Sequence, residues 1–147
     1  MRSSWFLLVL LSLSACRKDA KPAGELDGSW KMVRVEDRST GQIYTAPPGD
    51  EGKVALRFSG NSFSGQTVKN EFRDGSFELK NGNELTFGLV TNATLAMEDE
   101  WGMFLVNILT ACMLQSVSPC APSIVTRPVG NQLVIDPPLR YKVTFEK

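Results

Sequence analysis

Apolar and polar residues alternate along most of the chain, and this alternation constrains the fold more than any other feature of the sequence. The alternating segments are residues 54–58, 76–79, 85–87 and 139–146. In the last of them, Tyr141, Val143 and Phe145 are separated by Lys142 and Thr144. An alternation with one apolar face is typical of antiparallel strands that cover a core on one side.

Turn-forming residues stand between these segments. They are Pro47-Pro48-Gly49-Asp50, Asp74-Gly75, Asn81-Gly82-Asn83, Gly130-Asn131 and Pro137-Pro138. Pairs such as Asn81-Gly82 tolerate the positive φ angles that tight hairpins require. Many short strands that are separated by frequent turns predict a barrel or a sandwich.

One segment, Glu98–Cys112, has a helical period instead. Its apolar residues form a single stripe: Trp101, Phe104, Leu105, Ile108, Leu109 and Cys112. Glu98, Asp99 and Glu100 fall in the first turn, where the helix dipole favours carboxylates. We expect the stripe to pack on the sheet and close the core, the alternative being an aromatic patch that faces a membrane or ligand. The predicted fold class is therefore mainly β: a small antiparallel β-barrel or sandwich-like domain with one amphipathic α-helix.

The N-terminus has the order of features of an export signal. Arg2 precedes an apolar run, residues 5–11, that is too short for a permanent membrane helix of about 20 residues. The run is followed by Leu13-Ser14-Ala15-Cys16, which resembles the lipobox of bacterial lipoproteins. We predict a signal peptide at residues 1–15, cleavage before Cys16, and a diacylglyceryl and palmitate anchor on Cys16. An ordinary signal peptide that is cut after Ala15 is the alternative.

The remaining chain is then divided into a tether and one domain. Residues 16–25 comprise the lipidated cysteine and a flexible polar tether, and residues 26–147 form the β domain. Arg17 follows the cysteine, in place of the aspartate that retains enterobacterial lipoproteins at the inner membrane. We therefore predict a lipid-anchored protein of the cell envelope, at the outer membrane.

Two cysteines remain once Cys16 is lipidated. Cys112 and Cys120 form an even pair in an exported chain, which predicts a disulfide. A metal or redox pair is the weaker interpretation, because the chain has no histidine and no third soft ligand.

The order of motifs in residues 26–147 resembles the META domain family (HslJ-like). The matching positions are Leu26-Asp27-Gly28-Ser29-Trp30, Leu56-Arg57-Phe58, Gly65, Asn70, Phe72, Gly75, Phe77, Leu79, Gly82, Leu85, Phe87, Gly88, Thr94-Leu95-Ala96-Met97, Leu133, Ile135 and Val143-Thr144-Phe145. The chain departs from the family at Lys69 and Glu98, where many members carry cysteines. The resemblance implies a small antiparallel β-barrel-like domain with one helix, found in envelope or secreted proteins, and it implies no known reaction.

The residues offer little catalytic chemistry. The absence of histidine removes the commonest general base and excludes a Ser-His-Asp or Cys-His site. Asp99, Glu100 and Asp136 are the candidate carboxylates, but helix electrostatics explains the first two and the turn at Pro137-Pro138 explains the third. We therefore predict no enzyme, no cofactor and no metal. Since 16 basic and 16 acidic side chains balance, no nucleic acid is expected.

The leading hypothesis is a non-catalytic envelope module that binds a protein, a glycan or a small apolar ligand. One alternative is a periplasmic inhibitor of an attacking hydrolase of the lysozyme-inhibitor type. Such inhibitors present a Gly/Ser-rich loop with a lysine or arginine, and Ser59–Gly65 is loop-like in composition but carries no basic residue. The other is a lipocalin-like carrier of a small apolar ligand. In that case Gly28-Ser29-Trp30 would seal one end of the barrel, although the alternation places Arg140, the candidate cover for Trp30, on the outer face.

Overall fold

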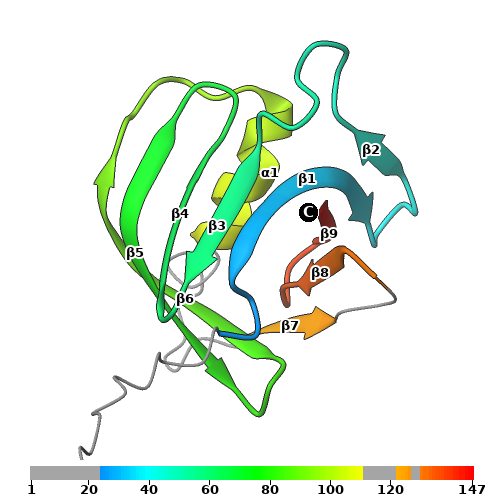
Figure 1. The fold of residues 1–147 in the computed structure, drawn as a ribbon. Coiled ribbons are helices and arrows are strands. Elements are labelled where there is room, and N and C mark those ends of the chain that lie inside the picture. Colours follow the sequence, from blue (N-terminus) through cyan, green and yellow to red (C-terminus); the bar gives the residue numbers. More distant parts are fainter. Residues whose placement is uncertain (1–23, 111–121, 127–129) are drawn as a thin grey trace, which may run out of the picture.

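The computed structural model describes residues 24–110, 122–126 and 130–147, and within them the chain forms nine strands and one helix (Figure 1). This confirms the predicted fold class. The elements are β1 (Gly28–Asp37), β2 (Ile43–Thr45), β3 (Ala55–Ser59), β4 (Ser62–Gln66), β5 (Glu71–Lys80), β6 (Glu84–Ala93), α1 (Glu100–Leu109), β7 (Ser123–Thr126), β8 (Gln132–Asp136) and β9 (Tyr141–Glu146).

The sheet is a closed antiparallel barrel of eight strands with one additional strand. Neighbours follow the chain order from β3 to β9, and the barrel closes where β9 pairs with β1. One edge of β1 pairs with β3 through its first residues and with β2 through residues 34–36, so β2 lies outside the closed ring. Figure 1 shows β1 as a strongly curved strand.

β-bulges interrupt three long strands, β1, β5 and β6, and change the direction of the side chains in β1 and β5. Val33 is an extra residue in β1 opposite β9, and after it the buried positions change from Trp30 and Met32 to Val35 and Asp37. Asp74 is an extra residue in β5 opposite β4 and has a φ of 56°. The predicted turn at Asp74-Gly75 is therefore wrong, because these residues lie inside a strand and the positive φ serves a bulge.

The other turn predictions are confirmed. Asn81-Gly82-Asn83 joins β5 to β6, and Asn81 and Gly82 have φ angles of 51° and 76°. The remaining proline- and glycine-containing segments lie between strands: 47–50 before β3, 130–131 before β8, and 137–138 between β8 and β9.

Apolar side chains fill the interior of the barrel. The predicted alternation is confirmed at Val54, Leu56 and Phe58, which are at most 2% exposed. The Phe58 ring contacts the rings of Phe63, Phe77 and Phe87, and Phe63 also contacts Phe87, at centroid distances between 4.9 and 6.3 Å. These contacts place an aromatic cluster in the core.

The helix completes the core as predicted. The five described side chains of the predicted stripe are at most 8% exposed: Trp101, Phe104, Leu105, Ile108 and Leu109. Phe104 contacts Tyr44 of β2 and Tyr141 of β9 at centroid distances of 5.1 and 4.9 Å. The helix begins at Glu100 and not at Glu98, because Asp99 is the N-cap and accepts a hydrogen bond from the Gly102 N–H. Glu98 precedes the helix, so its predicted place in the first turn is wrong.

Several predictions concern residues outside the described part of the chain. The signal peptide, Cys16 and most of the tether lie in residues 1–23, and Cys112 and Cys120 lie in residues 111–121. In the described residues, no helix combines the length and the apolar character needed to span a membrane.

Candidate functional site

An apolar groove lies between α1 and the end of β6. Its volume is about 400 Å³, and its apolar lining includes Val90 from β6, Met97 from the connecting segment, and Met103 and Val106 from α1. Leu95 and Met97 are 95% and 90% exposed, and Met103 is 43% exposed. Adjacent apolar side chains with this exposure are typical of a surface that binds a partner.

Asn70 holds the connecting segment in place beside the groove. Its side-chain amide donates to the Ala96 carbonyl at 3.0 Å, and its side-chain oxygen accepts from the Ala96 N–H at 2.6 Å. The same amide donates to the Glu98 carboxylate at 2.8 Å. One asparagine thus ties the start of β5 to residues 96–98, which fixes the backbone that presents Leu95 and Met97.

Glu98 places a negative charge at the edge of the groove. Burial by itself raises the pKa of this carboxyl, but hydrogen bonds from Thr67, Asn70 and the Asp99 N–H outweigh it and lower the pKa below its ordinary value. Glu98 is therefore ionised at neutral pH. No Lys or Arg of the described residues forms an ion pair with it.

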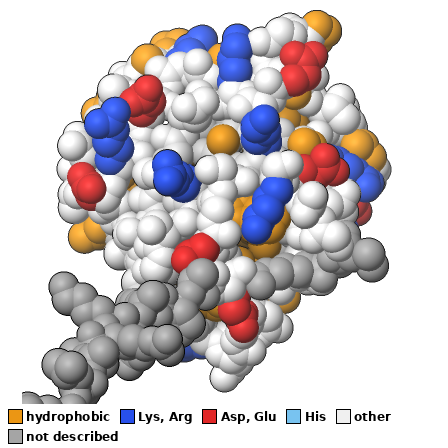
Figure 2. All heavy atoms as spheres, viewed as in Figure 1, with side chains coloured by type: hydrophobic (Ala, Val, Ile, Leu, Met, Phe, Trp, Pro, Cys, Tyr) orange, Lys and Arg blue, Asp and Glu red, His pale blue; other side chains and the backbone are white. Residues whose placement is uncertain are grey.

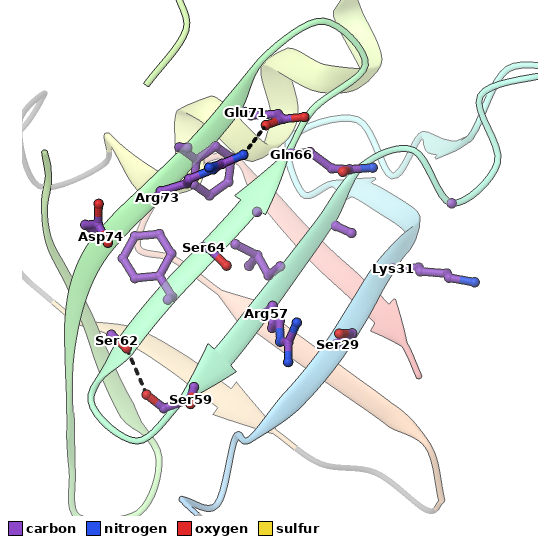
Figure 3. Close-up of a pocket in the computed structure, with 16 residues that line it drawn as sticks. Ser29, Lys31, Arg57, Ser59, Ser62, Ser64, Gln66, Glu71, Arg73 and Asp74 are labelled. Atoms are coloured by element: carbon purple, nitrogen blue, oxygen red, sulfur yellow. Dashed lines mark hydrogen bonds and ion pairs between the residues drawn. The ribbon is translucent and has the colours of Figure 1, made fainter. Parts of the chain in front are cut away.

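A second, polar hollow covers the outer face of β1, β3, β4 and β5 (Figure 3). It has a volume of about 790 Å³, its lining includes the small side chains Ser29, Ser62 and Ser64, and Figure 3 shows Ser64 between Arg57 and Arg73. Arg73 pairs with Glu71 at 3.2 Å. Figure 2 shows positive and negative side chains interspersed over the face seen in Figure 1. The hollow offers hydroxyl and guanidinium donors to a polar ligand.

The structure does not bring the three candidate carboxylates together as one site. Asp99 caps α1, Glu100 is exposed in its first turn, and Asp136 at the end of β8 accepts a hydrogen bond from Arg38. Within the described residues, no group of three His, Cys, Asp or Glu side chains is arranged to hold a metal ion.

A lysine, and not Arg140, covers Trp30. The Trp30 indole N–H donates to the Leu26 carbonyl at 2.7 Å, and Lys147 Nζ lies 4.8 Å from the ring centroid. Arg140 instead pairs with Asp37, which is 0% exposed, and this hydrogen bond, followed by those from Ser39, holds the pKa of Asp37 far below its ordinary value. Arg140 is thus a structural partner of a buried carboxylate.

The segment that is loop-like in composition, Ser59–Gly65, is a hairpin. Of Ser59–Gly65, only Gly60 and Asn61 lie between strands, because Ser59 ends β3 and Ser62 begins β4. The loop-like composition is therefore misleading outside these two residues, because Ser62 and Ser64 flank the inward-facing Phe63 within β4.

Sequence reasoning missed the groove. Thr94-Leu95-Ala96-Met97 stands out in the sequence only through the family resemblance, although Leu95 and Met97, two large apolar residues outside any predicted element, are a direct signal of an exposed apolar surface. The contacts of Asn70 with Ala96 and Glu98 could not be read from the sequence, because they join residues 26 and 28 positions apart.

The architecture defines a closed antiparallel β-barrel with one packed helix and two outer hollows. The chain is similar to the NMR structure of a protein from Burkholderia xenovorans, with a TM-score of 0.57, 22% sequence identity and coverage of 82% of each chain. At this identity the likeness shows the fold alone. No protein-family model matches the chain, and no curated protein matches it.

Proposed function

We propose that this chain is a bacterial lipoprotein whose META-like barrel is a non-catalytic binding module, held at the outer membrane by lipid on Cys16. The N-terminal order of Arg2, an apolar run and Leu13-Ser14-Ala15-Cys16 supports the anchor. The observation that carries the binding function is the exposed apolar groove beside α1.

Two features favour binding on the outside of the barrel. Apolar side chains fill the interior, so a lipocalin-like carrier has little support from the described residues. The groove instead presents Leu95 and Met97 on a segment that Asn70 holds rigidly, and a preorganised surface loses less entropy on binding. A protein partner is therefore the occupant that we propose.

Anchoring is tested by Cys16→Ser. The variant should lose labelling by radioactive palmitate and leave the membrane fraction, because stable attachment needs more than one acyl chain. A variant that stays in the membrane fraction would contradict the proposed anchor.

Binding is tested by photo-crosslinking in cells. A benzophenone amino acid at Met97 should give a discrete protein adduct, and the same group at Ile43 should not. Ile43 is a suitable control, because it is an exposed apolar residue on β2 and does not line the groove. Equal labelling from both positions, or none from Met97, would contradict a binding function of the groove.

A further inference from the structure

Among the described residues, the outer edge of β6 is largely unpaired beside the groove. β6 pairs with β5 along its length, but with β7 only through Glu84 and Leu85, and no other described strand pairs with residues 86–93. This segment, Thr-Phe-Gly-Leu-Val-Thr-Asn-Ala, contains none of the charged residues or prolines that commonly protect an edge from pairing, and its one irregularity is a bulge between Phe87 and Val90. Its backbone N–H and C=O groups can therefore accept an added strand.

The groove provides side-chain sites next to this edge. Gly88, Val90 and Ala93 of β6 line it on one side, and Met103 and Val106 of α1 line it on another. In an extended peptide, successive side chains point to opposite faces. A peptide paired with β6 would therefore direct alternate side chains towards the helix, into the apolar part of the groove.

The charge of Glu98 specifies the peptide further. Its carboxylate is half-buried and ionised, and its partners Thr67 and Asn70 are neutral donors. Because no described cation pairs with it, a Lys or Arg of the occupant would find a complementary charge at this end of the groove. Figure 1 shows the chain leaving β6 and crossing one end of the barrel to α1, and Glu98 lies at the end of this crossing.

We infer that the groove binds an extended segment of a partner protein, which adds a strand to residues 86–93 of β6. The segment has apolar side chains at alternate positions and a lysine or arginine that faces Glu98. This inference rests on the proposed binding function and names the chemistry of its partner.

The test is an unbiased peptide selection on the full chain, purified in detergent. Random dodecapeptides displayed on phage should yield sequences with apolar residues at alternate positions and at least one Lys or Arg. A synthetic peptide of the selected sequence should bind at least tenfold more weakly to Met103→Asp and equally well to Ile43→Asp. These two residues are a matched pair, because their exposed fractions are 43% and 44%.

Two further measurements test the register and the charge. Two N-methylated peptides are compared, one methylated at the even-numbered amides and the other at the odd-numbered amides. One should lose binding and the other should keep it, because only every second N–H of the peptide faces β6. Glu98→Gln should weaken the affinity for the selected peptide about tenfold. The same substitution should not change the affinity for a peptide in which norleucine replaces the basic residue.

Three outcomes would overturn the inference: selected peptides without this pattern, binding that is insensitive to Met103→Asp, or N-methylation tolerated in both registers. Binding of the Cys16→Ser chain to phosphatidylglycerol vesicles that is lost in Met97→Asp would also overturn it, because the groove would then contact lipid. Any of these results would overturn the added strand without contradicting the proposed function. Palmitate labelling and the crosslink from Met97 test that function separately, because neither depends on the conformation of the partner.

Discussion

Phe104→Ala should cost a large part of the stability of the domain. Phe104 is 5% exposed, and truncation of a buried phenylalanine costs about 3–5 kcal/mol. Its ring also contacts Tyr44, Trp101 and Tyr141 at centroid distances of 5.1, 6.2 and 4.9 Å. Because aromatic pairs contribute beyond the buried area, we expect the upper half of this range, about 4–5 kcal/mol.

Urea unfolding, followed by circular dichroism, measures this loss. With an m-value of about 2 kcal/mol per molar, the midpoint should fall by about 2 M and the slope should stay constant. Met103→Ala is the control, because Met103 is the preceding residue of the same helix and is 43% exposed. It should change the free energy of unfolding by less than about 1 kcal/mol.

Two results would refute this reasoning. A loss within about 0.5 kcal/mol for Phe104→Ala, the range of ordinary surface substitutions, would mean that the ring does not support the core. An equal loss in Met103→Ala would mean that the helix as a whole, and not the buried ring, determines the effect.

Asp37→Asn should reduce the free energy of unfolding at pH 7, where the Asp37 carboxylate is ionised and paired with Arg140. Because folding lowers the pKa of Asp37 from 3.8, its stabilising contribution is lost as the carboxylate is protonated, so the difference in unfolding free energy between variant and wild type should shrink as the pH falls below 3.8. Urea melts at pH 7, 5 and 3 measure this, and a difference that does not depend on pH would contradict it. Gly65→Ala should cost about 1–3 kcal/mol, because the added methyl would meet backbone of β3 and the ring of a buried phenylalanine, whereas the neighbouring Ser64→Ala should be within about 0.5 kcal/mol. Equal thermal melts of these two variants would disprove the close approach. Thiol titration of the denatured, unreduced protein should find Cys112 and Cys120 both unreactive, and two reactive thiols would exclude the predicted disulfide.

The local pattern of the sequence determined the elements of this fold. An alternation of apolar and polar residues predicts a strand, because successive side chains of a strand point to opposite faces. This relation does not depend on which neighbour the strand pairs with. The stripe from Trp101 to Leu109 determines the helix and its buried face for the same reason, since residues three and four apart lie on one side. Both features need only nearby residues, so the sequence suffices to predict them.

The role of Asp74-Gly75 was decided by tertiary structure. A tight turn and a β-bulge both accept a residue with positive φ, so the same dipeptide is compatible with either. Pairing of β5 with β4 and β6 on its two edges makes this position a bulge.

Closure of the barrel and the groove were likewise decided only in three dimensions. The sequence left a barrel and a sandwich open, because the pairing of Lys31 with Glu146 joins the two ends of the domain and leaves no local pattern. Asn70 and Glu98 acquire their roles only when the fold places the β4–β5 turn against the segment that follows β6. Hydrogen bonds and charges act over a few ångströms in space regardless of separation along the chain, and so this candidate site became visible only in the folded protein.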